Sequence, residues 1–125
     1  MYGFLLAIWS RDLPILKYLF EDCASHVQLH DQDLIRLFKH CIGAGNAQAL
    51  LFLMHSLVTA QIFSNAGLAA KEELIAYVLS DTCIESECIN SNKSEETVRE
   101  LKEVLSQYPY CAITWLYLDY TKDSN

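Results

Sequence analysis

The sequence predicts an all-α fold, a short solenoid of about three helix pairs closed by a C-terminal capping helix. Three observations support this prediction. Apolar residues recur at helical spacing, the pattern repeats after 34 residues, and 52% of the 125 residues are hydrophobic while 20% are charged. A chain of this length and composition can bury its own core, so residues 1–125 are expected to form a single domain.

The first helix pair spans about residues 2–22. The segment YGFLLAIW (residues 2–9) is expected to form a short helix that ends at the corner Ser10-Arg11. Asp12 can cap the next helix, and Pro14 falls in its first turn, where a missing amide proton costs little. The apolar residues of this second helix share one face, namely Leu13, Leu16, Leu19 and Phe20.

The second helix pair spans about residues 31–56. Its first helix opens at Asp31 or Gln32 and ends at the segment GAG (residues 43–45), because glycine just past a helix is a common stop. Asn46 can then cap the second helix of this pair.

A shift of 34 residues superposes the two pairs. The matched positions are Ala7 on Cys41, Ile8 on Ile42, Asp12 on Asn46, Leu13 on Ala47, Ile15 on Ala49, Leu16 on Leu50, Leu19 on Leu53 and Phe20 on Met54. Because cap, corner and apolar stripe all coincide, the two pairs are predicted to be copies of one repeated unit.

A third unit spans about residues 67–107 and is interrupted. Residues 67–80 are amphipathic and are expected to be its first helix, and the acidic segment at about 80–96 is predicted to be an insertion. The apolar stripe then resumes with Val98, Leu101, Val104 and Leu105. Pro109 is suited to a helix start, so residues at about 109–120 are expected to cap the last hydrophobic face.

Two segments resemble the ankyrin repeat. LAIWSRDLPILKYLFE (residues 6–21) has a small residue in the first helix, a tight corner and an apolar second helix, and CIGAGNAQALLFLM (residues 41–54) has them again. The resemblance covers about residues 2–107 and implies a scaffold that binds another protein. The Thr-Pro-Leu-His start of that family is absent from all three units, so a helical-hairpin solenoid of tetratricopeptide or HEAT type remains an alternative.

The formal net charge of −7 is uneven, because residues 1–65 carry −1 and residues 66–125 carry −6. Such a chain repels phosphate, so nucleic acid and anionic lipid are poor partners. Five cysteines at irregular spacing, with no leader that resembles a secretory signal, favour a cytoplasmic protein. The most apolar segment, residues 49–63, is shorter than the roughly 20 residues that span a bilayer, so no membrane span is expected.

Metal binding and catalysis have little support in the sequence. The potential zinc ligands lie in one region, namely Cys23, His26, His30, His40 and Cys41. Their spacing only partly matches that of structural zinc sites, and Cys41 is needed in the core. No nucleophile elbow, phosphate-binding glycine loop or dinucleotide fingerprint is present. We therefore expect no enzyme activity, no metal and no cofactor.

Binding to another protein is the function that remains. Stacked helix pairs present their first helices and connecting loops as one surface. On the second unit this surface offers His26, Gln28, His30, Asp33, Arg36, Lys39 and His40. Trp9 and Trp115 are candidate interface anchors, although core or capping roles are favoured. The sequence thus predicts a noncatalytic protein-protein interaction module, alone or within a larger protein; the alternative is a regulatory or targeting segment of a multidomain enzyme or bacterial effector.

Overall fold

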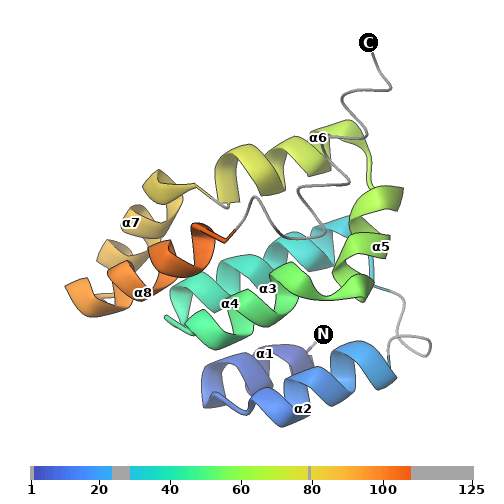
Figure 1. The fold of residues 1–125 in the computed structure, drawn as a ribbon, viewed down its shortest axis with the longest axis horizontal. Helices are drawn as coiled ribbons and strands as arrows, with labels where there is room; N and C mark the ends of the chain where they lie inside the picture. The colour runs from blue at the N-terminus through green and yellow to red at the C-terminus, as the bar shows by residue number, and fades with distance from the viewer. Residues whose placement is uncertain (1, 24–28, 79, 108–125) are drawn as a thin grey trace.

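The computed structural model describes residues 2–23, 29–78 and 80–107, and every regular element in this part of the chain is a helix (Figure 1). In chain order the elements are α1 (Tyr2–Ser10), α2 (Leu13–Lys17), η1 (Tyr18–Asp22), α3 (Asp31–Gly43), α4 (Ala47–His55), α5 (Leu57–Asn65), α6 (Leu68–Glu72), η2 (Glu73–Val78), α7 (Asp81–Asn90) and α8 (Glu95–Leu105). The elements η1 and η2 are π-helical turns that continue α2 and α6. The all-α class is confirmed for these residues, whereas the capping helix predicted at 109–120 lies outside them.

Three helix pairs share one corner geometry. Arg11, Gly45 and Asn92 adopt positive φ angles of 61°, 66° and 59°. In each corner the next amide donates to a carbonyl five residues back: Asp12 N to Ala7 O (2.9 Å), Asn46 N to Cys41 O (2.9 Å) and Lys93 N to Cys88 O (2.8 Å). This left-handed cap satisfies the last carbonyls of a helix and lets the chain reverse. The pairs α1–α2, α3–α4 and α7–α8 are therefore three hairpins with the same corner.

A polar side chain caps the second helix of each hairpin. Asp12 accepts from Ile15 N (3.3 Å), Asn46 from Ala49 N (3.1 Å) and Ser94 from Thr97 N (3.3 Å). The predicted caps at Asp12 and Asn46 are confirmed, as is the placement of Pro14 in the first turn of α2.

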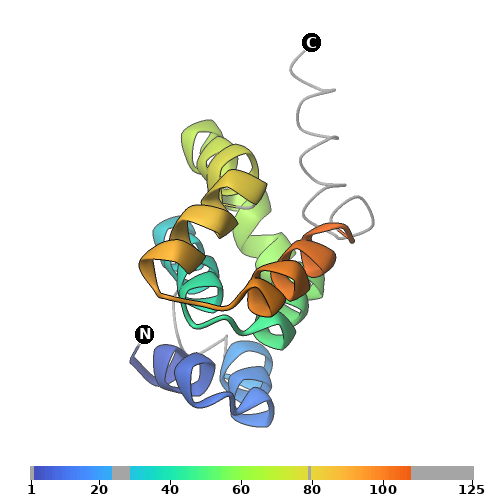
Figure 2. The same ribbon diagram turned by 90° about the vertical axis from the view of Figure 1, so that its left-hand side faces the viewer.

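The hairpins pack in two rows (Figures 1 and 2). The first helices contact one another in the order α1, α3, α7, and the second helices in the order α2, α4, α8. Helix α3 is the centre of the arrangement, because it also contacts α4, α5, α6 and η2.

The third hairpin differs from the one predicted. The segment expected to be an insertion, residues 80–96, contains helix α7, and α7 rather than the helix beginning at Leu68 pairs with α8. Only Ile84 and Cys88 are buried on α7, in a helix that also carries three acids. Because the buried side of α7 has only these two residues, one of them a cysteine, the apolar pattern of the sequence did not predict this helix. The predicted helix of residues 67–80 exists as α6 and η2, which pack on α3.

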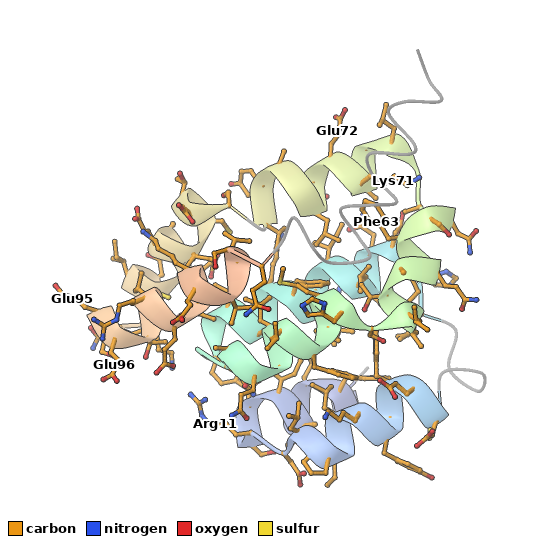
Figure 3. The ribbon with its side chains drawn as sticks, viewed as in Figure 1. Arg11, Phe63, Lys71, Glu72, Glu95 and Glu96 are labelled. Carbon is orange, nitrogen blue, oxygen red and sulfur yellow. The ribbon has the colours of Figure 1, made fainter. Side chains whose placement is uncertain are left out.

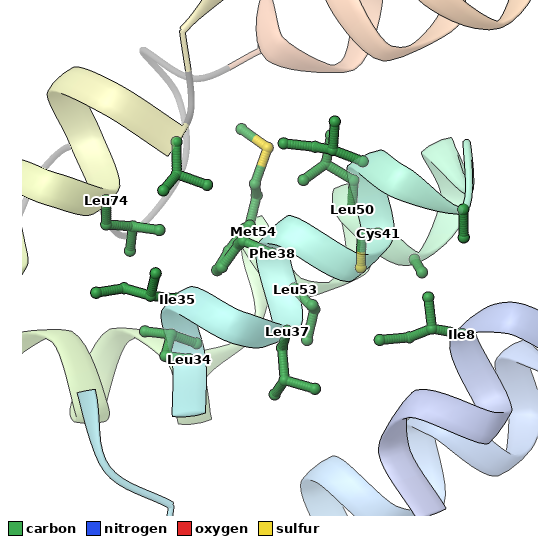
Figure 4. Close-up of a cluster of buried hydrophobic side chains, with 14 of the residues drawn as sticks. Ile8, Leu34, Ile35, Leu37, Phe38, Cys41, Leu50, Leu53, Met54 and Leu74 are labelled. Atoms are coloured by element: carbon green, nitrogen blue, oxygen red, sulfur yellow. The ribbon is translucent and has the colours of Figure 1, made fainter. Parts of the chain in front are cut away.

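The second hairpin supplies more of the buried core than either of the other two hairpins (Figure 4). Helix α3 buries Leu34, Ile35, Leu37, Phe38, Cys41 and Ile42, and helix α4 buries Ala49, Leu50, Leu53 and Met54. Ile8 enters this core from α1 and Leu74 from η2 (Figure 4). The buried residues of α3 recur every three to four positions, as the sequence predicted.

Helices α5, α6 and η2 lie between the second and third hairpins in the chain. Ser56 separates α4 from α5 and caps α5 by accepting a hydrogen bond from Val58 N (3.2 Å). Lys71 on α6 is only 4% exposed, and its ammonium lies 5.7 Å from the centroid of the Phe63 ring on α5 (Figure 3). This contact joins the two helices at a position where a charge would otherwise be costly to bury.

Among the described residues, no single helix is long and apolar enough to cross a bilayer. Helices α4 and α5 together have the length and composition for one span, but they are bent by 65° relative to each other. The apolar face of α4 is buried in the protein core, which accounts for its composition.

Candidate functional site

Helix α3 carries most of the residues predicted to bind a partner, and the structure divides them between its two ends. His30, Asp33, Arg36, Lys39 and His40 lie on α3 or at its cap. His26 and Gln28 lie outside the described residues.

The N-terminal end of α3 uses two of these residues as a cap. The amide of His30 donates to Asp33 Oδ2 at 3.0 Å, and the carboxylate also lies in the first turn, where the helix dipole favours negative charge. Beside them is an open hollow of about 440 Å³ between the start of α3 and helix α5. Asp33 therefore has a structural role that accounts for its position.

The C-terminal half of α3 presents the remaining three residues to solvent. Arg36 is exposed. Lys39 Nζ lies 3.7 Å from Glu73 Oε1 on η2, and both side chains are at least 40% exposed, so this ion pair adds little stability. The side chain of His40 contacts helix α1.

The contact of His40 is Trp9, which is 52% exposed on α1. The indole N–H of Trp9 donates to His40 Nδ1 at 3.0 Å, and the two rings meet edge to face with centroids 6.2 Å apart. Because Nδ1 accepts this bond, a neutral His40 carries its proton on Nε2. The structure thus places Trp9 at the surface between the first two hairpins, and not in the core.

A cation from the third hairpin completes the cluster. Lys93 Nζ lies 5.9 Å from the centroid of a Trp9 ring, within the range of a cation–π interaction. The side chain of Lys93 lies next to Gly45, the corner residue of the second hairpin. A Cβ added at Gly45 would lie 3.6 Å from Lys93 Cδ and Cε and 2.7 Å from Thr97 Cγ2. Glycine at this corner therefore supplies both the positive φ angle and the space that brings the third hairpin close.

Together these residues form a shallow groove of about 270 Å³, which we call the Trp9 groove. It is lined by Trp9, Lys39, His40, Gly43, Glu87 and Ser91. The lining comes from α1, α3 and α7, the first helices of all three hairpins and the corner after α7. The groove thus offers an aromatic surface, ammonium and hydroxyl donors, and one carboxylate.

The sequence identified Lys39 and His40, and it gave Trp9 as a candidate interface anchor although a core or capping role was favoured; it did not identify Glu87, Ser91 and Lys93. One signal was present for Trp9, because the 34-residue shift places it on Gly43. Trp9 packs over that glycine, whose added Cβ would lie 3.9 Å from Trp9 Cζ2. The sequence could not predict Glu87 and Ser91 as site residues, because residues 80–96 were expected to be an insertion and not a helix of the stack.

The thiols of the described residues show no sign of a metal site or disulfide. Cys23, Cys41, Cys83 and Cys88 are free, and no three potential metal ligands converge within the described ranges. Burial raises the pKa of the Cys41 thiol, as expected for a core residue. Burial also raises the pKa of Cys83 and Cys88.

In comparisons with protein-family models, with curated proteins and with solved structures, the chain has no significant match.

Proposed function

We propose that this chain is a noncatalytic protein-protein interaction module, built as an ankyrin-like stack of three helix hairpins. The observation that supports the fold assignment most is the corner, which is repeated three times with the same backbone hydrogen bonds. The ordered contacts of α1, α3 and α7 add to it, because repeat proteins align their first helices in this way.

The binding surface in this proposal is the exposed side of the first helices, centred on the Trp9 groove. Tryptophan is enriched among the residues that contribute most to protein interfaces. Trp9 is held in place by His40 and is still half-exposed, so it is ordered and accessible before any partner arrives. Such preorganisation lowers the entropic cost of binding.

The chemistry of the groove fits a protein better than a nucleic acid. Lys39 and Lys93 are accompanied by the acids Glu73 and Glu87, and the whole chain has a net charge of −7. A surface of this mixed character does not attract a polyanion. It can accept a peptide segment that covers Trp9 and hydrogen-bonds the polar rim.

The test is affinity capture of the tagged chain from its native cell, with paired surface variants. The double variant Arg36→Glu/Lys39→Glu and the single variant Trp9→Ala alter the proposed surface. Lys17→Glu/Arg99→Glu makes the same charge change at exposed positions on the second helices. We expect one captured protein to be lost with the first two variants and kept with the control; equal capture by all four chains would contradict the proposed surface.

A further inference from the structure

The hydrogen bond between Trp9 and His40 has a titratable acceptor. Trp9 Nε1 donates to His40 Nδ1 at 3.0 Å, and the two ring planes meet at 77°. A neutral imidazole can accept at Nδ1, whereas an imidazolium carries a proton on both nitrogens and can only donate. Protonation of His40 would direct two N–H groups at each other across this distance. The hydrogen bond can therefore exist only while His40 is neutral.

The ring of Trp9 has little else to hold it in place. Within the described residues, His40 provides the one hydrogen bond of the Trp9 side chain. Lys93 adds a cation–π contact at 5.9 Å, which fixes no particular ring angle, and Gly43 beside the ring has no side chain. Because Trp9 is also 52% exposed, loss of the hydrogen bond would leave the ring free to turn into solvent.

Charged side chains of both signs surround His40 at the C-terminal half of α3. They come from α3 itself and from the neighbouring elements, namely Arg36 and Lys39 on α3, Arg11 in the corner after α1, Glu73 on η2, Glu87 on α7 and Lys93 in the corner after α7. Protonation of His40 would add one more cation beside Lys39 and Lys93. The other cations and the carboxylates belong to residue types that ordinarily keep their charge between about pH 5 and 8, whereas histidine ordinarily changes charge there.

The thiols of α7 near this cluster do not titrate in the same range. Cys83 is close enough to Lys39 and Glu87, and Cys88 to Lys93 and Glu87, to be affected by their charges. Burial is the larger influence and raises the pKa of both thiols, so they stay neutral near neutral pH.

We infer that Trp9 and His40 form a pH-sensitive switch, in which protonation of His40 breaks their hydrogen bond and releases the Trp9 ring. The sign follows from the acceptor: the bond forms with neutral His40 and is lost as the pH falls. For its consequence the switch rests on the proposed function, because an ordered Trp9 is the preorganised centre of the proposed interaction surface. That surface is then organised at neutral and higher pH and disorganised by acid.

Nuclear magnetic resonance of the full chain tests the switch without any partner. The chain has two tryptophans, and the indole signal of Trp9 is identified by its absence in Trp9→Phe. Between about pH 8 and about pH 5.5 this signal should move in one step toward the position of a solvated indole, with the same midpoint as the ring protons of His40. The order parameter of the indole N–H should fall from about 0.85 to below about 0.6.

Three histidine variants give the controls, and far-UV circular dichroism shows that each is folded. In His40→Gln the side chain does not titrate, so the indole signal should stay constant with pH. In His40→Ala the ring should be released already at about pH 8, a condition that needs no acid. His55→Gln changes an exposed histidine on α4, outside the groove, and its Trp9 should titrate as in the wild type.

Each of three results would overturn the switch. These are an indole signal that does not follow His40, a signal that still titrates in His40→Gln, and an order parameter in His40→Ala equal to that of the wild type at about pH 8. The proposed function is tested separately by affinity capture. If capture contradicts the interaction surface, titration of Trp9 still establishes the switch; if Trp9 does not titrate, the switch is wrong whatever the capture shows.

Discussion

The second and third hairpins have the same corner but very different interiors. Both corners use a residue with positive φ and the same hydrogen bond across the turn, at Gly45 and at Asn92. The helices of the second hairpin bury ten residues, whereas those of the third bury four, namely Ile84, Cys88, Leu101 and Val104. The corner is thus a local device that does not depend on how much core its helices supply.

Different features therefore determine the shape of a hairpin and its stability. A left-handed cap and a polar N-cap act within a few residues, so they can form a hairpin whether or not its flanks are strongly apolar. Stability instead follows from burial of apolar surface, which is concentrated on α3 and α4. The third hairpin should therefore be correctly shaped and the less stable of the two.

Truncation of one leucine in each hairpin should give the largest difference. Leu50 and Leu101 are both fully buried, on α4 and α8. Leu50→Ala should cost about 4 kcal/mol because α4 is enclosed by α2, α3, α5 and α8 and cannot collapse onto the cavity, whereas Leu101→Ala should cost about 2.5 kcal/mol. Urea unfolding followed by circular dichroism measures both values. Equal costs would show that the third hairpin is as tightly packed as the second.

The same comparison explains how much of the fold could be predicted from the sequence. The first two hairpins were predicted because their signals agree: Asp12 and Asn46 at the caps, a repeated corner and long apolar stripes. The third hairpin was misassigned chiefly because α7 is short of apolar residues, and the residue type at the corner did not compensate, since Arg11, Gly45 and Asn92 all adopt the same positive φ. Backbone conformation at a single residue is weakly encoded, since asparagine also occurs widely outside such turns.

The N-cap residues of the second and third hairpins differ in their other hydrogen bonds. Their substitution should therefore give the next largest difference in the free energy of unfolding. Asn46 is 6% exposed, and besides capping α4 its Nδ2 donates to Ile8 O of the first hairpin at 3.0 Å. Ser94 is exposed and caps only α8. Asn46→Ala should cost about 2–3 kcal/mol, because it also removes the buried hydrogen bond to Ile8 O and leaves that carbonyl only the longer bond from Arg11 N (3.3 Å), and Ser94→Ala should cost about 1 kcal/mol.

Asn46→Asp provides the matched control for this prediction. The carboxylate keeps the cap to Ala49 N but cannot donate to Ile8 O, so thermal unfolding should show a loss close to that of Asn46→Ala. An Asn46→Asp variant that unfolds at the wild-type temperature would mean that the link between the first two hairpins contributes nothing.

The candidate site illustrates a second limit of sequence reasoning. The exposed positions of α3 follow from its helical period, which is why Arg36, Lys39 and His40 were identified. The neighbours Trp9 and Lys93 come from the ends of other helices, 31 and 53 positions away from His40 in the chain. Their meeting depends on how the corners stack over Gly45, and helical periodicity carries no information about that contact.

Two cysteines at matching positions give the most direct comparison of the hairpins in the native state. Cys41 and Cys88 each supply the carbonyl that closes the corner of their hairpin, and both side chains are fully buried. Burial raises the pKa of both thiols, so the reactive thiolate is scarce until the surrounding structure opens. Alkylation at these sites therefore reports local opening of each hairpin.

Under native conditions at pH 8 we expect Cys88 to be alkylated at least about tenfold faster than Cys41, which corresponds to about 1.4 kcal/mol less opening free energy. Site-resolved mass spectrometry after timed exposure to iodoacetamide measures both rates, and the half-buried Cys23 and Cys83 serve as internal references for accessible thiols. Leu101→Ala should speed the reaction of Cys88 without changing that of Cys41, because it weakens only the third hairpin. If instead both cysteines react at one rate in the wild type and in the variant, the hairpins open together, and the smaller core of the third is stabilised fully by its contacts with α3 and α4.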